Sequence, residues 1–348
     1  MERTLRSLLV QQYADYEIIV SDNHSTDETA AIIKSFADQG VRYCRPTQDA
    51  EWMTDKPKYI GAYYNANYAL SQARGEYLCV YHADDLYAPD IVLKEAALLS
   101  AEPNAGAVFT MLCAIGDDGQ AIRMGTRQLP PELQGRNYFD FATLFNAIMQ
   151  YGNFLPTPSV MLRRSVYDEI GGFDEQSFMT SADLELWLRI AQHCAIGIID
   201  EPLLNYRMGF KQYGAQYNRY RTTPADFFLV MDYFLAQQET QQLVAPQPRA
   251  MYELRRSADL IECATSLLTQ ERVDEAQALL RRATVSSNFA TAVRHRSKRF
   301  IRLMAGAGLL GSSWIGLGPV VGRRLQQMDL KRLQQLHMPL PQTEDKKL

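Results

Sequence analysis

The chain has 348 residues, of which 47% are hydrophobic and 22% are charged, a composition typical of a globular protein with a sizeable core. The formal net charge of -4 argues against a general nucleic-acid binder, because such proteins carry an excess of basic side chains. The five cysteines are widely spaced and include no Cys-x-x-Cys pair, so we expect unpaired thiols in a reducing compartment and no zinc site. The first residues lack the pattern of a signal peptide, so we expect a cytoplasmic protein whose sequence begins in a helix.

Apolar runs that are typical of strands alternate with helical patterns through the first two thirds of the chain. The expected strands are residues 16–20, 41–44, 75–81 and 107–110, and the expected helices are residues 25–36, 59–73 and 89–99. Ser25-Thr26-Asp27-Glu28 has the pattern of a capping box, and Asp117-Asp118-Gly119 is typical of a hairpin turn. Strands that alternate with helices predict an α/β fold, with a mostly parallel sheet covered by helices on both faces.

The pattern changes to helices alone after about residue 215. The expected elements are a helix over residues 225–238, a linker over 242–248 and a helical hairpin formed by 254–268 and 273–283. We therefore expect an α/β domain over residues 1–215 and a helical C-terminal region over residues 216–348.

Carboxylates follow two of the predicted strands. Asp22 ends the first strand, and the adjacent pair Asp84-Asp85 ends the third. In open α/β sheets, ligands bind beyond the carboxyl ends of the strands. Adjacent carboxylates repel each other unless a cation or hydrogen bonds compensate, and hard oxygen ligands suit Mg²⁺ or Mn²⁺. The alternative is a solvated pair of acids in the loop before the helix that starts at Pro89.

Two stretches of sequence carry a family resemblance. The first reads Ser7-Leu8-Leu9-x-Gln11-x-Tyr13-x-x-x-Glu17-Ile18-Ile19-Val20-x-Asp22-Asn23-x-Ser25-Thr26-Asp27-x-Thr29. The second reads Asn67-x-x-Leu70-x-x-Ala73-Arg74-Gly75-Glu76-Tyr77-Leu78 and leads into Ala83-Asp84-Asp85-x-Tyr87-x-Pro89. Together they resemble family 2 glycosyltransferases, which are inverting enzymes with a Rossmann-like GT-A fold that binds nucleotide sugars. The resemblance extends over residues 3–207.

The resemblance implies roles for four of these residues. Asp22 would contact the base of the nucleotide, with a carboxylate stabilised at a helix N-terminus as the alternative. Asp84 would contact the ribose or the metal, and Asp85 would be the main ligand of an Mg²⁺ or Mn²⁺ ion that holds the diphosphate. Asn67 occupies a position where the family often has a donor-side residue, and a structural position on its helix is an equal alternative.

A second block of the resemblance implies the general base. Pro158-Ser159-Val160-Met161-Leu162-Arg163-Arg164 precedes Gly171-Gly172-Phe173-Asp174-Glu175 and then Ala182-Asp183-Leu184-Glu185-Leu186-Trp187-Leu188-Arg189. The acid at the position of Asp183 would take the proton of the acceptor hydroxyl during in-line attack. The alternative makes Asp183 the N-cap of the helix that follows. Glu185 is the weaker candidate for the base, and we expect Trp187 in the core.

The sequence departs from the family pattern in two places. The usual first apolar strand and its Pro-Thr-Tyr-Asn-like turn are missing before the first helix, which would leave unpaired backbone groups in the middle of the sheet. This departure raises the alternatives of a misplaced start or a truncated chain. The family's Tyr-Arg-x-His motif reads Tyr206-Arg207-Met208-Gly209 here, without its histidine. His82, which precedes the acidic pair, is a possible substitute or a structural residue.

An uncharged segment, residues 303–322, lies between basic residues in the C-terminal region. Its length approaches the ~20 residues that span a bilayer, but its five glycines and the basic flanks fit a segment on an anionic membrane surface better. We assign residues 294–324 as this candidate surface segment. The alternative is a helical hairpin that packs on the first domain.

The expected function is inverting transfer of a sugar from a nucleotide-diphosphate sugar, most plausibly a UDP-sugar, to an acceptor hydroxyl. The acceptor would be a glycan or a lipid-linked sugar, and the protein would act in the cytoplasm or peripherally on the inner face of the membrane. The alternative from another class is a catalytically silent scaffold that binds nucleotide sugars or glycans. Nucleotidyl transfer would require a Gly-rich N-terminal loop, which the sequence lacks.

Overall fold

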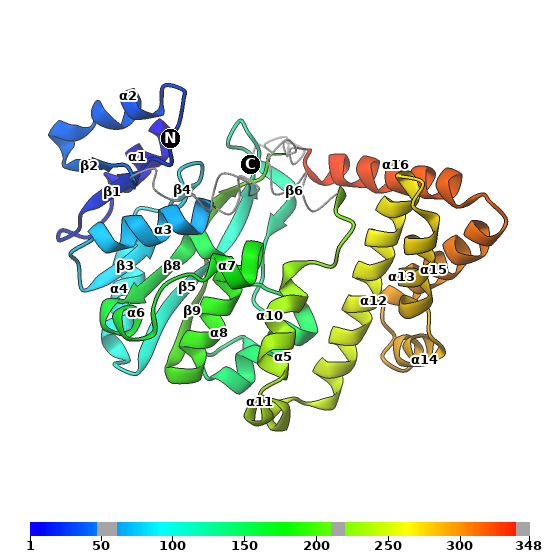
Figure 1. Cartoon of the computed structure of the whole chain (residues 1–348). Helices are drawn as coiled ribbons and strands as arrows, with labels where there is room; N and C mark the ends of the chain where they lie inside the picture. Colours follow the sequence, from blue (N-terminus) through cyan, green and yellow to red (C-terminus); the bar gives the residue numbers. More distant parts are fainter. Residues whose placement is uncertain (47–60, 210–219, 339–348) are drawn as a thin grey trace, which may run out of the picture. The chain divides into compact units, whose positions relative to one another are not determined.

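The computed structural model describes residues 1–46, 61–209 and 220–338 (Figure 1). These residues form two compact units: Met1–Phe145 with Asn153–Met208, and Asn146–Gly152 with Gly209–Met338. The predicted boundary between residues 215 and 216 lies outside the described residues. The helix α5 (Phe141–Tyr151) passes from the first unit into the second, which the sequence did not predict.

The first unit alternates strands and helices, as predicted. Its strands are β1 (Ile18–Ser21), β2 (Val41–Cys44), β3 (Tyr77–Val80), β4 (Leu86–Tyr87), β5 (Ala105–Ile115), β6 (Ala121–Thr126), β7 (Tyr138–Phe139), β8 (Val160–Arg163) and β9 (Ala195–Arg207). Besides the start of α5, its helices are α1 (Glu2–Leu8), α2 (Thr29–Lys34), α3 (Gly61–Gln72), α4 (Ile91–Ala101), α6 (Arg164–Ile170), α7 (Glu175–Phe178) and α8 (Ala182–His193). Every strand and helix that the sequence predicted here has a counterpart: β2 has the predicted ends, and the other elements have shifted ends.

Among the described residues, the strands form two separate sheets. β1 and β2 pair in parallel, and the larger sheet has the order β3-β8-β5-β9-β4, with β6 beside β5 and β7 beside β9. In the larger sheet only β5 and β9 run parallel, and every other recorded pair is antiparallel. The α/β class is confirmed, but the prediction of a mostly parallel sheet is wrong. That prediction rested on the alternation of helices and strands. In the structure, β6 returns through a hairpin turn, and β8 inserts between β3 and β5 in the opposite direction.

Helices cover both faces of the larger sheet. Successive residues of a strand point to opposite faces, so neighbouring residues of β5 contact different helices. Val108 of β5 belongs to the apolar cluster that includes Ile91 and Leu99 of α4. The next residue, Phe109, lies edge-on to Trp187 of α8, with ring centroids 5.1 Å apart. β5 is therefore buried between α4 and α8, in agreement with the predicted layers.

The two sheets are connected through helices. α3 contacts both β1 and β3, and each of these strands pairs with a single neighbour among the described strands (Figure 1). β1 is only half-buried although three of its four residues are Ile18, Ile19 and Val20, which are typical of a central strand. The unpaired edges that the sequence predicted in this part of the sheet are thus present.

The start of α2 differs from the prediction. The expected capping box at Ser25 does not form, because the backbone N–H of Ser25 donates to the carboxylate of Asp22 at 2.8 Å. The helix begins at Thr29, whose N–H donates to Asp27 at 3.0 Å. Residues 22–28 therefore form a loop held by aspartate side chains.

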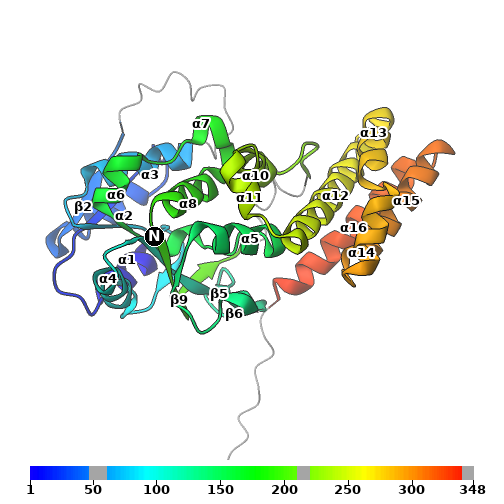
Figure 2. The ribbon, with the colours of Figure 1, turned by 90° about the horizontal axis from the view of Figure 1, so that it is seen from below.

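The second unit is helical throughout its described residues. It contains α10 (Asp226–Leu235), α11 (Gln238–Leu243), α12 (Pro246–Thr269), α13 (Val273–Ala283), α14 (Ser286–Arg294), α15 (Arg299–Trp314) and α16 (Gly318–Leu336). The hairpin of α12 and α13 is confirmed, and α15 and α16 pack against α12 as well (Figure 2). The predicted linker is short, because α11 ends at Leu243 and α12 begins at Pro246.

Glycines allow α15 and α16 to approach α12 closely. A Cβ atom on Gly306 would lie 2.6 Å from Ile261, and one on Gly318 or Gly322 would lie 3.0 Å from Leu268. The uncharged segment 303–322 therefore consists of the end of α15, a turn and the start of α16. No helix in the described part of the chain has the length and apolar character required to span a bilayer.

Candidate active site

Asp85 is the most deeply buried acid of the predicted site. Its side chain is 0% exposed, and its Oδ1 accepts the backbone N–H of Arg207 at 2.7 Å. Its Oδ2 is buried without a hydrogen-bond partner among the described residues. Burial raises the pKa of Asp85 to about 7, against the lowering effect of the Arg207 bond, and the charge of Asp84 raises it further. A buried carboxylate oxygen without a donor is costly unless a cation compensates it.

Asp84 and His82 complete a group that fits a divalent cation. One ligand atom from each of His82, Asp84 and Asp85 lies within 4.8 Å of the other two. Two carboxylate oxygens and an imidazole nitrogen suit Mn²⁺, and the carboxylates suit Mg²⁺. The donor set and the unpartnered Oδ2 of Asp85 thus fit the predicted metal. The structure also places His82, left open between a substitute ligand and a structural residue, beside the acidic pair.

Two elements fix the loop that carries the acidic pair. Thr4 of α1 donates to the carbonyl of Ala83 at 2.8 Å, and Ser7 of the same helix accepts the N–H of Tyr87 at 3.3 Å. The Tyr87 hydroxyl in turn accepts the N–H of His82 at 2.6 Å. The loop is therefore held by α1 on one side and by β4 on the other, so the ligand atoms have a preset geometry.

Arg207, at the end of β9, holds the same loop from the opposite side. Its Nε donates to the carbonyl of Asp84 at 2.8 Å, and its Nη1 donates to the carbonyls of Gly116 at 2.6 Å and Asp117 at 2.9 Å. One guanidinium therefore ties the acidic loop to the turn between β5 and β6. The backbone N–H of Arg207 supplies the bond to Asp85 described above.

Asp183 lies in the first turn of α8 and is not its N-cap, which is Ser181. Its Oδ2 accepts the hydroxyl of Thr157 at 2.5 Å, and its Oδ1 accepts the N–H of Leu184 at 2.7 Å. Burial raises the pKa of Asp183, and hydrogen bonds from Thr157, Leu184 and Tyr63 only partly offset that rise. A carboxylate with a raised pKa is better suited to accept a proton near neutral pH than an ordinary aspartate.

Tyr206 links the acidic pair to Asp183 electrostatically. Burial raises the pKa of Tyr206 to about 12, and the charges of Asp85, Asp84 and Asp183 raise it as well, against a lowering by Arg127. One side chain therefore lies in the electrostatic field of both the predicted metal ligands and the predicted base.

Glu185, the weaker candidate for the base, is engaged in an ion pair, and Trp187 lies in the core as expected. Glu185 is 3% exposed and forms a two-point ion pair with Arg189 at 2.8 and 2.9 Å. Arg189 also donates to the carbonyl of Gly172 at 2.7 Å, so the pair ties α8 to the turn before α7. Trp187 is buried against Phe109 and Phe173 in the core.

Asp22 lies on the smaller sheet and shares none of these recorded contacts with the acidic pair. Its Oδ1 accepts the N–H of Ser25 at 2.8 Å, and its Oδ2 accepts the hydroxyl of Tyr43 at 2.9 Å. Burial raises its pKa, but the bonds from Ser25 and Tyr43 and the charge of Arg45 outweigh this effect, so the pKa is lowered overall. Both oxygens thus hold the loop after β1. The contact with a nucleotide base stays a prediction.

Asn67 lies on α3 with its amide engaged by the backbone of Phe173. Its Nδ2 donates to the carbonyl of Phe173 at 2.9 Å, and its Oδ1 accepts the N–H of Phe173 at 3.0 Å and the hydroxyl of Tyr167 at 3.2 Å. This arrangement favours the structural alternative over the donor-side role. It also explains Gly172, where a Cβ atom would lie 2.3 Å from Asn67 Oδ1.

The sequence did not identify Arg207, Thr157 or Tyr206 as site residues. Arg207 and Tyr206 stand in the motif whose missing histidine was noted, which is the one signal that pointed to this end of β9. Thr157 precedes the second block of the resemblance and has no pattern of its own. These three residues meet the acids only through the fold.

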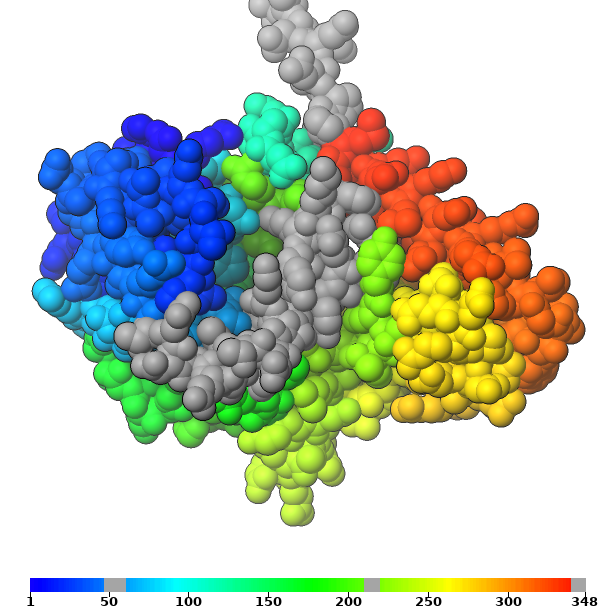
Figure 3. Space-filling view, turned by 45° about the horizontal axis from the view of Figure 1, so that its top comes forward, coloured from blue at the N-terminus to red at the C-terminus, as the bar shows by residue number. Residues whose placement is uncertain are grey.

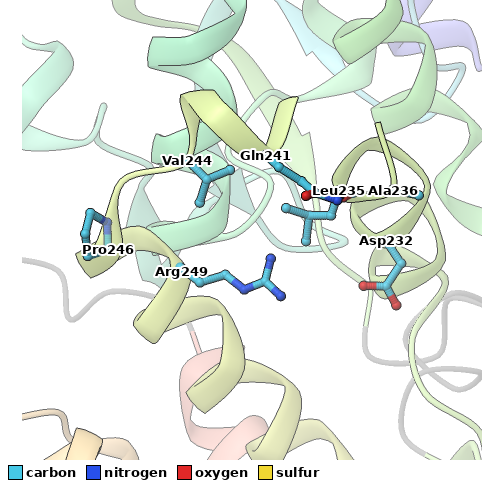
Figure 4. A pocket seen from close by; sticks show the side chains of 7 residues that line it. All are labelled: Asp232, Leu235, Ala236, Gln241, Val244, Pro246 and Arg249. Carbon is cyan, nitrogen blue, oxygen red and sulfur yellow. The ribbon is translucent and has the colours of Figure 1, made fainter. Parts of the chain in front are cut away.

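A separate hollow lies within the helical unit, between α10, α11 and α12 (Figure 4). It is lined by Asp232, Leu235, Ala236, Gln241, Val244, Pro246 and Arg249. Its charged residues are engaged nearby, because Asp232 accepts the hydroxyl of Tyr252 at 2.9 Å and Arg249 pairs with Glu253 at 3.2 Å. The hollow therefore offers no set of free groups for catalysis.

Known proteins resemble this chain in sequence over part of its length and in fold. The chain is 28% identical over 211 residues to an uncharacterized protein of Mycobacterium tuberculosis, covering 58% of this chain and 61% of that protein. It is 30% identical over 195 residues to EpsE of Bacillus subtilis, covering 54% and 62%. The chain thus spans about 60% of the length of these relatives.

Among solved structures, residues 1–349 of S. aureus TarS in complex with UDP match with a TM-score of 0.51 at 14% identity. The match covers 90% of this chain and 87% of that one, and it shows that the fold is GT-A. The model of glycosyl transferase family 2 matches residues 1–171, which contain Asp22, Asn67 and the acidic pair. The part of the chain formed by residues 1–171 is therefore assigned to glycosyl transferase family 2.

Proposed function

We propose that this protein transfers a sugar, with inversion, from a nucleotide-diphosphate sugar to an acceptor hydroxyl in a reaction that depends on Mg²⁺ or Mn²⁺. The observation that carries the proposal is the buried Oδ2 of Asp85, which has no donor among the described residues and lies beside His82 and Asp84 in a family 2 domain. A buried carboxylate oxygen without a compensating partner costs stability. A cation at this position would account for the burial of Asp85.

The residues divide into a donor side and an acceptor side. A bound Mg²⁺ or Mn²⁺ would stabilise the diphosphate leaving group, and Asp85, Asp84 and His82 would hold it. Asp183 accepts the proton of the attacking hydroxyl, and its raised pKa and its bond from Thr157 support this role. Tyr206 lies in the electrostatic field of both groups.

We propose a UDP-sugar as the donor. The support is that the fold matches a TarS structure that was solved with UDP. In this proposal Asp22 contacts the base, which requires one oxygen to accept an N–H from the ring besides its present bonds from Ser25 and Tyr43. A carboxylate has about four acceptor positions, so the two roles are compatible.

We propose that the acceptor is a glycan or a lipid-linked sugar of polysaccharide biosynthesis in the cell envelope. The protein would then be cytoplasmic and work peripherally on the inner face of the membrane. The support is the uncharged segment 303–322 with its basic flanks. A lipid-linked acceptor is presented at such a surface.

The test is a donor screen with purified protein. Release of nucleotide from UDP-, dTDP- and GDP-sugars should be measured with Mg²⁺, with Mn²⁺ and with EDTA. We expect metal-dependent release, which Asp85→Ala abolishes and the exposed control Asp200→Asn leaves intact. Full metal dependence in Asp85→Ala would contradict the assignment of Asp85, and activity in EDTA equal to that with metal would contradict the mechanism.

A non-catalytic binding protein is the second candidate, because the sheet is divided between Asp22 and the acidic pair. It predicts that a UDP-sugar binds, seen by calorimetry, without turnover for any acceptor. UDP-sugar binding that Asp85→Ala weakens, together with no nucleotide release from any of the three donors, would favour the binding protein over the enzyme.

A further inference from the structure

One face of α15 is apolar and yet exposed to solvent. Ile301 is 75% exposed, Met304 53% and Trp314 62%, and Ile315, directly after the helix, is 72% exposed. Ile301 and Met304 lie on one side of the helix, which Gly308 and Gly311 continue without side chains, and Trp314 and Ile315 stand at its C-terminal end. We call Ile301, Met304, Trp314 and Ile315 the apolar face.

The opposite face of α15 already forms the core of its unit. Leu303, Gly306 and Leu309 are buried, and Leu303 and Leu309 belong to the same cluster as Leu267 of α12. The side chains of the apolar face are therefore not part of the core of this unit. A helix at a protein surface normally turns charged or polar residues outward, and one that is apolar all round is usually buried in protein or in lipid.

The surroundings of the apolar face carry mostly positive charge. Between Glu275 and Asp329 the sequence has no acidic residue and nine Arg and Lys residues. Two acids from α12 and the turn after it, Glu262 and Glu271, reach this region and pair with Arg302 and Arg323. Five of the basic residues are exposed: Arg294, Arg296 and Lys298 before α15, and Arg323 and Arg324 in α16. In the described part of the chain, none but Arg323 has a recorded ion pair, and its distance to Glu271 is 3.6 Å. This density of positive charge is complementary to an anionic surface.

The lengths of α15 and α16 exclude a membrane-spanning arrangement of this segment and favour binding in the membrane interface. α15 ends at Trp314 and α16 starts at Gly318, so the uncharged segment is too short to cross a bilayer as one helix. A helix that lies in the interface needs an apolar face with tryptophan or long aliphatic side chains and basic residues beside it. Figure 3 shows α15 and α16, in orange and red, at the surface of the molecule.

We infer that the apolar face of α15 inserts into the headgroup region of an anionic bilayer, with the exposed basic residues before α15 and in α16 bound to lipid phosphates. The inference specifies the surface that the proposed membrane-linked function requires, but it does not depend on catalysis. Trp314 and Ile315 anchor the end of the helix in the interface, where an indole ring is favoured. The packing of Gly306 on Ile261 keeps the helix in place, so binding needs no refolding.

The alternative occupant is a second copy of the chain. Burial of this face in a dimer would place basic residues of the two copies near each other, which like charges disfavour. The charge around the face therefore argues for a partner with negative charge. A lipid bilayer that contains phosphatidylglycerol has that charge together with an apolar interior.

The experiment is flotation of the full chain with vesicles of phosphatidylcholine alone or with about one third phosphatidylglycerol. We expect binding to the anionic vesicles that weakens as salt rises, and little binding to the neutral ones. Ile301→Asp with Met304→Asp should weaken binding at least tenfold, because two apolar contacts are lost and charge is added. Arg323→Gln with Arg324→Gln should weaken it roughly tenfold.

Leu229→Asp is the matched control, since Leu229 is exposed on α10 of the same unit and lies outside the apolar face. It should bind like the unchanged protein. A second readout is quenching of tryptophan fluorescence by brominated lipid, which Trp314→Phe should remove. Circular dichroism melts confirm that each variant folds, as expected for exposed positions.

Three outcomes would overturn the inference. They are no binding of the unchanged protein to anionic vesicles, equal binding by the Ile301 and Met304 variant, and a dimer that this variant dissociates without any vesicle binding. Sugar release with a soluble acceptor is measured on the same samples. Because that reaction needs no membrane, loss of vesicle binding with retained release separates failure of this inference from failure of the proposed function.

Discussion

The backbone N–H of Arg207 donates to Oδ1 of Asp85 across 122 residues of sequence, and this bond leaves the other carboxylate oxygen directed away from any protein donor among the described residues. The end of β9 thus orients the acid that follows β3. The guanidinium of the same arginine holds the carbonyl of Asp84. Arg207 is therefore a positioning residue for the proposed metal ligands.

Arg207→Met should lower the affinity for Mn²⁺ by roughly tenfold, because residues that orient metal ligands have effects of this size. The backbone N–H that bonds Asp85 remains in this variant, so the loss reports on the guanidinium alone. The measurement is calorimetric titration with Mn²⁺, supported by the metal dependence of sugar release. Arg123→Met, at an exposed position of β6, is the control. Unchanged Mn²⁺ affinity in Arg207→Met would remove the positioning role.

Asp183→Asn should reduce kcat by about 10²–10⁴-fold while the KM for the donor changes little, because a general base acts in the chemical step. In the unchanged protein kcat should fall as the pH drops through the pKa of Asp183, which is raised above that of an ordinary aspartate. The residual rate of Asp183→Asn should lack this pH dependence. A pH profile of kcat for both proteins decides the matter, and full activity in the asparagine variant would refute the assignment.

Asn67→Ala should destabilise the protein by about 2 kcal/mol without raising the KM for the donor, since it leaves the N–H and C=O of Phe173 without their partners. Urea unfolding gives the first quantity and steady-state kinetics the second. Asn67→Asp serves as the companion variant, because a carboxylate cannot donate to the Phe173 carbonyl. A raised donor KM at unchanged stability would restore the donor-side role.

Glu95→Gln should make stability less dependent on pH. Glu95 is 0% exposed, its Oε2 accepts the hydroxyl of Tyr81 at 2.7 Å, and burial raises its pKa well above the usual value. The folded state thus prefers the protonated acid. Its stabilising effect is complete below the pKa of the unfolded chain and is lost as the pH rises through the raised pKa. In urea unfolding at pH 5, 7 and 9, the free energy of unfolding of Glu95→Gln should rise relative to that of the unchanged protein as the pH increases. Glu76→Gln, at an exposed site, should show no such trend.

The sequence predicted the parts of the site that depend on local order. Asp22 and the acidic pair follow apolar runs, and a strand that ends in an acid can be recognised from its own few residues. The helix at Asp183 was predicted on the same basis, although Asp183 lies in its first turn and not at its N-cap. These predictions succeeded because strand and helix periodicity are properties of neighbouring residues.

The contacts that hold the site could not be predicted in this way. The bonds of Arg207 to Asp85 and of Asn67 to Phe173 join residues more than a hundred positions apart. The direction of β8 between β3 and β5 is likewise set by packing and not by its four residues. The capping box failed for a related reason, since Asp22 competes successfully for the N–H of Ser25.

The helix α3 connects the two sheets of the first unit. Asn65 bonds Ser21 of the smaller sheet, with its Nδ2 3.0 Å from the Ser21 carbonyl, while Asn67 bonds Phe173 beside the larger one. Positions two apart on a helix differ by about 200° around its axis and about 3 Å along it. The helix therefore joins the strand that precedes Asp22 to the loop at Phe173. The spacing between these two attachment points is set by the rise of the helix, whereas a continuous sheet would set it by the distance between strands.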